Sequence, residues 1–245
     1  MQTIQDNNEI RIAVDPHFEW DGQNAYLFDI DGTLLRSRDR VHFESVAIGV
    51  QRAMGIEVSL AGVPIHGNTD TGILREACRQ AGIEEDTLEP QVATIRAAMC
   101  ASVEERRDEL DPILMPGITE TLKHLAERGA LLGVATGNLE AIGWIKIEAA
   151  GLREWFRFGG FSDHYPDRAE LIAKAAEKAR ELAGMEASVC VVGDTPRDIA
   201  AAHANGLPVI AVATGHFSFE QLAEHKPEVC ASSLADLLAA SVARP

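Results

Sequence analysis

Two aspartates follow a short apolar run near the N-terminus. Residues 25–28 are apolar and lead directly into Asp29 and Asp31, after which Gly32 allows the chain to turn. If a strand ends between the two aspartates, both carboxylates can face one crevice. Charge at the end of a buried strand is energetically unfavourable unless it is compensated. The segment therefore predicts a functional site rather than a solvated loop.

Polar motifs also follow two later apolar runs. Thr136, Gly137 and Asn138 come after residues 131–135 and offer a hydroxyl and backbone N–H groups. Residues 189–192 lead into the segment 193–198, which reads Gly-Asp-Thr-Pro-Arg-Asp. Taken alone, each motif could equally serve a turn or a helix cap, and Thr195 in particular has the features of an N-cap.

The three motifs together indicate a metal site. In an open parallel sheet, ligands bind beyond the carboxyl ends of the strands, so Asp29, Asp31, Thr136, Asp194 and Asp198 are expected to converge. Several carboxylates in one crevice repel each other unless a cation lies between them. Ligands that are all oxygen favour a hard ion, and Mg²⁺ is the expected one.

The elements that must position these residues alternate between strands and helices. Continuous apolar runs suit strands buried on both faces of a parallel sheet, and they occur at 25–30, 131–135, 189–192 and 209–213, with weaker candidates at 156–161 and 10–14. Helical patterns lie at about 116–128, 141–150, 168–182 and 195–205. This alternation predicts an α/β fold with a Rossmann-like, doubly wound parallel sheet.

Residues 36–115 interrupt the alternation. This segment has no convincing strand, and its helical patterns cover about 39–54, 69–80 and 87–107. We expect an all-helical cap domain at 36–115, inserted into a core domain formed by 1–35 and 116–245. Within the cap, Asn68 and Thr69 could cap a helix or contact a substrate, and the roles of His42 and His66 are open.

Composition narrows the possible partners. The 245 residues are 46% hydrophobic and 24% charged, which is typical of a globular protein. A formal net charge of −16 disfavours binding to nucleic acid or to an anionic membrane. No apolar run is long enough to span a bilayer. A small anionic substrate remains possible if local cations or a metal offset the field.

The cysteines and the N-terminus bear on the compartment. Cys78, Cys100, Cys190 and Cys230 are widely spaced and form no CxxC pair, so neither disulfides nor a zinc site are expected. Residues 1–9 are polar and lack the pattern of a secretory signal. The expected compartment is the cytoplasm, and the protein is expected to be a monomer or a homodimer.

The motifs resemble those of the haloacid dehalogenase superfamily, in the subgroup with a helical cap after the first strand, and are similar to phosphoglycolate phosphatase-like hydrolases. Residues 29–34 match motif one, Thr136 matches motif two and residues 193–198 match motif four. The resemblance covers residues 24 to about 240. It implies a Mg²⁺-dependent phosphatase that hydrolyses the phosphomonoester of a small metabolite.

The resemblance also implies a role for each motif residue. Asp29 would be the nucleophile that forms an aspartyl-phosphate, and Asp31 would be the general acid and then the base. Thr136 and the N–H of Gly137 would hold the phosphoryl oxygens, with Asn138 as a further substrate-binding residue.

The same resemblance implies the metal ligands. These would be the carboxylates of Asp29 and Asp194, the backbone carbonyl of Asp31, and Asp198 as an outer ligand. At motif three the sequence departs from the pattern, because the usual lysine at the start of a helix is replaced by Arg168. We expect Arg168 to clamp the phosphoryl group, with Lys174 as the alternative cation.

Two other functions remain open. One is a sugar-phosphate mutase similar to β-phosphoglucomutase, and the other is a regulatory protein that keeps the fold without catalysis. The cap contains no lysine, since the first one is Lys123. Its absence argues against the phosphonoacetaldehyde hydrolases of the superfamily and weakens the mutase alternative. Asp31 argues against the dehalogenases proper.

Overall fold

A seven-stranded sheet forms the centre of the computed structural model, which describes residues 11–163, 165 and 167–242. The strand order is β1-β9-β8-β7-β2-β5-β6, and all neighbours are parallel except β1 and β9. The strands are β1 (Ile12–Val14), β2 (Ala25–Phe28), β5 (Leu131–Ala135), β6 (Phe158–Gly160), β7 (Val189–Gly193), β8 (Val209–Val212) and β9 (Val229–Ala231). Of the strand expected at 10–14, residue 10 lies outside the described residues.

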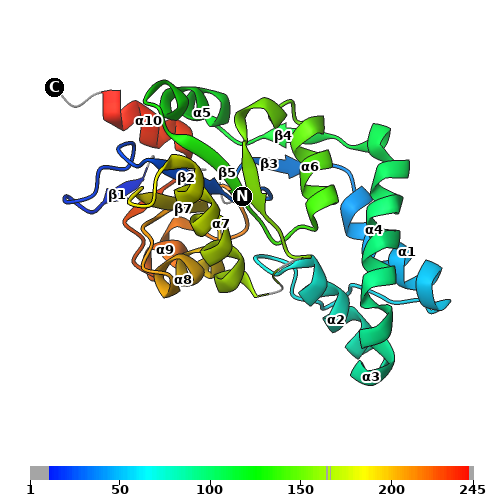
Figure 1. Cartoon of the computed structure of the whole chain (residues 1–245). Helices are drawn as coiled ribbons and strands as arrows, with labels where there is room; N and C mark the ends of the chain where they lie inside the picture. Colours follow the sequence, from blue (N-terminus) through cyan, green and yellow to red (C-terminus); the bar gives the residue numbers. More distant parts are fainter. Residues whose placement is uncertain (1–10, 164, 166, 243–245) are drawn as a thin grey trace, which may run out of the picture.

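Helices cover both faces of this sheet (Figure 1). Successive side chains of a strand point to opposite faces, so Tyr26 and Phe28 of β2 pack in one apolar core while Ala25 and Leu27 pack in the other. The first core includes residues of α5 (Ile118–Glu127) and α10 (Leu234–Val242), and the second includes residues of α7 (Arg168–Ala183), α8 (Pro196–Ala204) and α9 (Phe219–Ala223). The α/β, doubly wound fold predicted from the sequence is confirmed.

The first turn of α8 follows the sequence prediction closely. The Thr195 side chain accepts a hydrogen bond from the N–H of Asp198, and the Asp198 side chain accepts one from the N–H of Thr195. Pro196 occupies the first helical position, where a missing N–H is not needed. This capping box fixes the start of α8 directly beyond the carboxyl end of β7.

The insert between β3 and β4 has an apolar core of its own. Its helices are α1 (Val41–Met54), α2 (Asp70–Gln80), α3 (Glu85–Leu88) and α4 (Val92–Glu105), drawn blue to green beside the sheet in Figure 1. Helix α6 (Glu140–Ala149) belongs to the core, yet Ile142 and Ile145 on it pack within the cluster formed by the insert. This shared apolar contact docks the helical insert against the sheet-bearing part.

Two expectations about the insert are wrong in detail. Its ends are not helical, because β3 (Leu35–Ser37) and β4 (Pro112–Leu114) form an antiparallel pair where the insert leaves and rejoins the core. The helix expected at 87–107 is broken at a 3₁₀ turn, Glu89–Gln91, since Pro90 lacks a backbone N–H for a helical hydrogen bond. The boundaries 36 and 115 remain a prediction.

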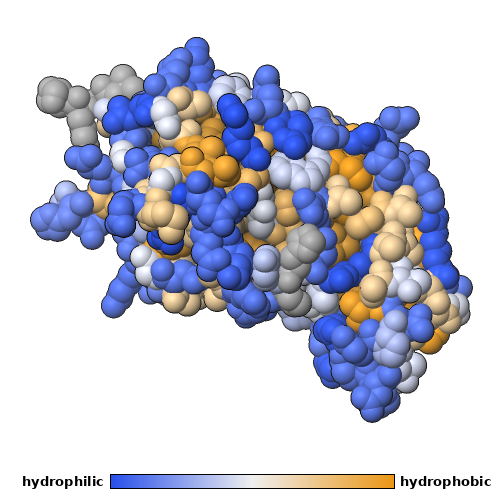
Figure 2. Space-filling model, in the orientation of Figure 1, coloured by the Kyte–Doolittle hydropathy of each residue, from blue (hydrophilic) through white to orange (hydrophobic). Residues whose placement is uncertain are grey.

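The described surface agrees with the acidic, polar composition. Figure 2 shows a mostly hydrophilic face, with smaller apolar areas on both the sheet-bearing part and the helical insert. Within the described residues, every helix is too short or too polar to cross a bilayer.

Candidate active site

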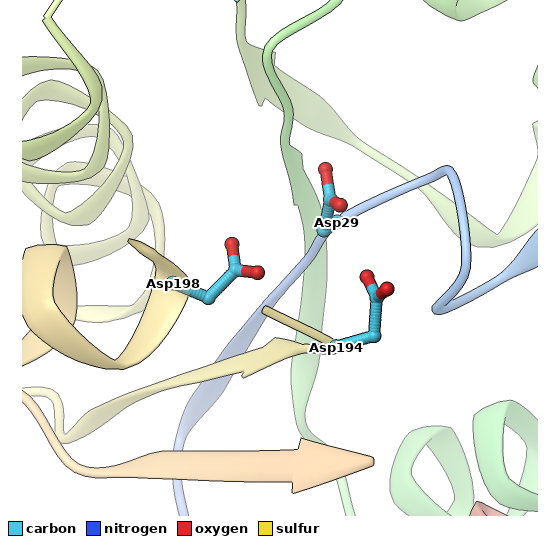
Figure 3. A group of neighbouring side chains, drawn as sticks. All are labelled: Asp29, Asp194 and Asp198. Carbon is cyan, nitrogen blue, oxygen red and sulfur yellow. The ribbon is translucent and has the colours of Figure 1, made fainter. Parts of the chain in front are cut away.

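Three buried aspartates converge beyond the carboxyl ends of β2 and β7 (Figure 3). Asp29 follows β2, Asp194 follows β7, and Asp198 lies in the first turn of α8. One carboxylate oxygen from each of the three lies within 4.8 Å of the others. Because β2 and β7 are adjacent and parallel, their ends meet at one edge of the sheet. This is the convergence that the sequence predicted for these three residues.

The loop after β2 turns sharply at Gly32 and is held from two sides. Gly32 has a φ of 88°, which a residue with a side chain rarely adopts. Its carbonyl accepts a hydrogen bond of 2.6 Å from Oγ1 of Thr214, beyond β8. The hydroxyl of Thr33 donates to Oδ1 of Asp194 over 3.1 Å. The turn therefore places Asp29 and Asp194 against each other.

Arg168 is the cation within this cluster. Its side chain is buried at the N-terminus of α7, where Nη2 lies 3.2 Å from Oδ1 of Asp29 and 2.5 Å from Oδ1 of Asp198. The other oxygen of Asp198 accepts from the backbone N–H and the hydroxyl of Thr195. Lys174, the alternative cation, instead pairs with Glu177 over 2.8 Å on the surface of α7.

The charges of the cluster do not cancel. Burial raises the pKa of Asp29, although Arg168 acts in the opposite direction. Burial, together with the charges of Asp29 and Asp198, raises the pKa of Asp194 well above its usual range. Burial disfavours the Arg168 cation, but Asp198 and Asp29 outweigh it and raise the pKa of Arg168. One guanidinium faces three carboxylates, so the site favours a further positive charge.

This donor set fits Mg²⁺. All three carboxylates supply oxygen atoms, the ligands that Mg²⁺ prefers. Gly215 leaves the space that Asp194 occupies, because a Cβ at Gly215 would overlap Oδ2 of Asp194. Both oxygens of Asp198 already accept hydrogen bonds, which suits an outer position.

Thr136, Gly137 and Asn138 line the same cavity, beyond the end of β5. Thr136 is buried, and its hydroxyl accepts a hydrogen bond of 3.3 Å from the N–H of Asn138. Nδ2 of Asn138 donates to Oδ2 of Asp31 over 3.0 Å. The loop after β5 therefore brings a hydroxyl and an amide next to the aspartates of β2.

Asp31 does not join the three-aspartate cluster. Its carboxylate points instead to Lys146 of α6, and Nζ of Lys146 lies 2.5 Å from each of its oxygens. Burial acts to raise the pKa of Asp31, but the charges of Lys146 and His42 and the hydrogen bonds from Lys146 and Asn138 lower it. The two aspartates of the first motif thus have different partners and different proton affinities.

A cavity of about 260 Å³ lies between the core and the insert. Asp29, Asp31, Arg168 and Thr136 line it from the core, and the insert contributes both polar and apolar side chains, among them His42, Phe43, His66, Asn68 and Ile73. Thr69 caps α2 by accepting a hydrogen bond from the N–H of Gly72, so capping is its role in this structure.

Lys146 is the residue that the sequence analysis missed. It lies in α6 among Ile142, Ile145 and Ile147 and is only 2% exposed. The signal was present, because Lys146 follows Ile142 by four residues and therefore occupies the buried face of that helix. A lysine on an apolar helix face, directly after a polar strand-end motif, predicts a buried charge with a partner.

The fold and the site define a class of α/β proteins with clustered carboxylates at the carboxyl edge of a parallel sheet. The sequence model of a protein family described as "Haloacid dehalogenase-like hydrolase" matches residues 26–212 of this chain. The chain belongs to this family.

Relatives with assigned names agree with this membership, and a solved structure agrees with the fold. A phosphoglycolate phosphatase of Pseudomonas savastanoi pv. phaseolicola is 27% identical over 227 residues, covering 86% of this chain and 77% of the relative. A phosphoglycolate phosphatase of Yersinia pseudotuberculosis is 27% identical over 230 residues, covering 87% of this chain and 90% of the relative. The crystal structure of a predicted phosphatase from Clostridium acetobutylicum has a TM-score of 0.67 at 21% identity, and the match covers 90% of this chain and 98% of that one. At that identity the structural likeness supports the fold alone.

Proposed function

We propose that this hydrolase is a Mg²⁺-dependent phosphatase that cleaves the phosphomonoester of a small metabolite through an aspartyl-phosphate. The observation that carries the proposal is the convergence of Asp29, Asp194 and Asp198 with Arg168 in one buried cluster that borders the cavity. Sequence similarity to enzymes named phosphoglycolate phosphatase points to the same reaction class.

Asp29 is the proposed nucleophile. It follows the central strand β2, is buried, and borders the cavity with one oxygen in contact with Arg168. Attack on phosphorus would form an Asp29–phosphoryl bond and break the bond to the leaving oxygen. Arg168, the hydroxyl of Thr136 and the N–H of Gly137 are the proposed partners of the phosphoryl oxygens, where negative charge is concentrated in the transition state.

Asp31 is the proposed general acid and base. It borders the cavity, and its partner Lys146 contacts His42 of the insert. In the first step it would donate a proton to the leaving oxygen, and in the second it would take a proton from the water that hydrolyses the aspartyl-phosphate. Asn138 would help to hold its carboxylate in place.

The residues that would hold Mg²⁺ are Asp29, Asp194 and the backbone carbonyl of Asp31, with Asp198 as an outer partner. When bound, the ion supplies charge neutralisation to the phosphoryl group and to the clustered carboxylates. Holding these carboxylates rigidly in the fold is the contribution of this chain.

Phosphoglycolate is the first substrate to test, because relatives carry that name. The cavity accepts a small ester, and the apolar side chains of the insert border it together with His42 and His66. The four free cysteines favour a reducing compartment, so we place the enzyme in the cytoplasm.

Turnover of p-nitrophenyl phosphate and phosphoglycolate, with Mg²⁺ and after exhaustive treatment with EDTA, tests the proposal. Wild-type protein is expected to release inorganic phosphate only with the metal. Asp29→Asn has nearly the same shape and is expected to lose on the order of 10³-fold or more in rate. Full activity in EDTA, or Asp29→Asn activity within about tenfold of wild type, would reject this mechanism. A mutase would instead turn over only with a sugar bisphosphate.

A further inference from the structure

The amino group of Lys146 is enclosed by polar atoms from both parts of the molecule. Nζ lies 2.5 Å from Oδ1 and Oδ2 of Asp31 and 3.2 Å from Oδ1 of Asn138. It also lies 3.2 Å from Nδ1 of His42, which belongs to α1 of the insert. An ammonium group has three N–H donors, so these contacts account for its hydrogen-bonding capacity.

The buried position of Lys146 is energetically unfavourable for an ammonium group that lacks charged or polar partners. Its side chain is 3% exposed, and the helix face around it is formed by isoleucines. Removing a lysine from water costs several kcal/mol, which only well-placed partners recover. Asp31, by contrast, keeps 43% of its side chain exposed.

Lys146 fixes the direction of the Asp31 carboxylate. Asp31 lies on the loop that turns at Gly32, outside β2. Two contacts from Nζ and one from Nδ2 of Asn138 hold both oxygens. Without Lys146, only the Asn138 contact among these would remain, and the carboxylate could rotate.

The same amino group connects Asp31 to the docked insert. Nε2 of His42 lies 3.0 Å from Oδ2 of Asp70, the first residue of α2. That oxygen also accepts a hydrogen bond of 2.8 Å from the N–H of Leu139, at the start of α6. The backbone N–H of Asp70 donates to the carbonyl of Gly137 over 2.7 Å. The row Asp31–Lys146–His42–Asp70 thus runs from the core into the insert and back.

We propose that Lys146 is a positioning residue for Asp31, and that His42 completes its surroundings only when the insert is docked on the core. The proposal rests on the phosphatase function proposed above. Lys146 holds the Asp31 carboxyl group in one direction at the cavity, where its protonated form would donate the proton to the leaving oxygen and become the carboxylate. Docking of the insert is thereby coupled to the orientation of Asp31, the proposed general acid.

The test compares esters that differ in how much they need a general acid. An alkyl phosphate such as phosphoglycolate requires protonation of its leaving oxygen, whereas the p-nitrophenolate group leaves readily without it. Lys146→Met is expected to lower kcat/KM for the alkyl ester on the order of 10²-fold, because a small misplacement of a catalytic group has an effect of this size. The loss for the aryl ester is expected to stay within about threefold, since that step needs little acid catalysis.

Lys178→Met is the matched control. Lys178 is an exposed lysine that pairs with Glu181, so the same substitution there should leave both rates unchanged. Lys146→Arg keeps the positive charge and should restore part of the alkyl activity. His42→Ala should lower the ratio of alkyl to aryl activity in wild type but add nothing in the Lys146→Met background, because coupled residues are not additive.

A stability measurement tests the contact without turnover. The change in melting temperature caused by Lys146→Met should shrink in an Asp31→Asn background if the two side chains interact as described. Equal losses for both esters, no loss for either, or fully additive melting temperatures would overturn the role of Lys146. If wild-type protein hydrolyses neither ester, the proposed phosphatase function fails. If wild type is active but the ratio is unchanged in Lys146→Met, only the role of Lys146 fails.

Discussion

Nη2 of Arg168 lies 3.2 Å from Oδ1 of Asp29, so the arginine at the start of α7 contacts the aspartate at the end of the central strand. The two residues are far apart in the sequence, because Asp29 follows β2 whereas Arg168 begins the helix after β6, two strands away from β2 in the sheet. The same guanidinium contacts Asp198. Arg168 therefore neutralises part of the cluster from which the proposed nucleophile would act.

Arg168→Ala is expected to lower kcat/KM on the order of 10²-fold or more, because a desolvated charge-assisted contact contributes several kcal/mol to the transition state. Arg168→Lys should recover part of the rate, limited by the loss of the planar fork. Steady-state kinetics with p-nitrophenyl phosphate provides the measurement. Lys174→Ala is the control and should act as wild type, because Lys174 pairs with Glu177 on the surface.

Stability must be followed in the same variants. Arg168→Ala leaves Asp29 and Asp198 without their buried cation, and breaking a buried pair costs about 3–5 kcal/mol. The variant should therefore melt earlier, and activity is compared only under conditions in which it is folded. An inactive Lys174→Ala beside a fully active Arg168→Ala would assign the motif-three role to Lys174.

Mg²⁺ binding is expected to depend on pH through Asp194. Burial raises the pKa of Asp194 above its usual range, so the metal-free protein binds a proton there that Mg²⁺ must displace. Apparent affinity should therefore rise with pH. Without metal, folding stability should fall as pH rises, because the unfolded chain releases this proton more readily than the folded one.

Melting temperatures with and without Mg²⁺, at about pH 6 and about pH 8.5, test this linkage. The increase caused by Mg²⁺ should be larger at the higher pH. Ca²⁺ should also raise the melting temperature but support little activity, since its geometry is looser. Asp194→Asn is the control and should reduce both the increase and its pH dependence. If Mg²⁺ raised the melting temperature by the same amount at both pH values, Asp194 would not be the group that links Mg²⁺ binding to pH.

The sequence predicted the parts of the fold that depend on local pattern. The buried runs of β2, β5, β7 and β8 and the N-cap at Thr195 are continuous segments, whose hydrophobicity and turn residues suffice to identify them. The short strand pairs β3–β4 and β1–β9 are harder to predict from the sequence. Each has three residues per strand and is stabilised by a partner far away in the chain.

The candidate site divides in the same way. Asp29, Asp194 and Asp198 follow predicted strand ends or a predicted helix start, so strand order alone brings them together. The partner of Asp31 could not be obtained from motif spacing. Lys146 approaches it from the buried face of α6, and His42 approaches from the insert. Those contacts depend on how the insert docks, which is a tertiary property.

The thiols of the native protein are expected to be unreactive. Burial raises the pKa of all four cysteines, to about 11 for Cys100 and Cys230. Since the thiolate is the reactive form, Ellman's reagent at about pH 8 should react slowly with the folded protein. All four thiols should react after unfolding in guanidinium chloride. Rapid labelling of the folded protein, mapped by mass spectrometry, would show that a thiol is more accessible than the structure indicates.

The rings of His66 and His216 stack across the junction between insert and core. Their centroids are 4.1 Å apart and their planes differ by 2°. Burial, and then the charge of His216, lower the pKa of His66, so the stacked state binds fewer protons than a separated one. The contact is therefore complete above about pH 6.5, the usual histidine value, and weakens as pH falls below it.

His66→Phe keeps a ring in the stack but cannot be protonated. Between about pH 7.5 and about pH 5.5, the melting temperature of wild type should fall more than that of His66→Phe. The difference should be at most about 3 °C, since His66 is exposed and such contacts contribute under about 1 kcal/mol. The same pH dependence in both proteins would show that the histidine stack does not make docking of the insert sensitive to acid.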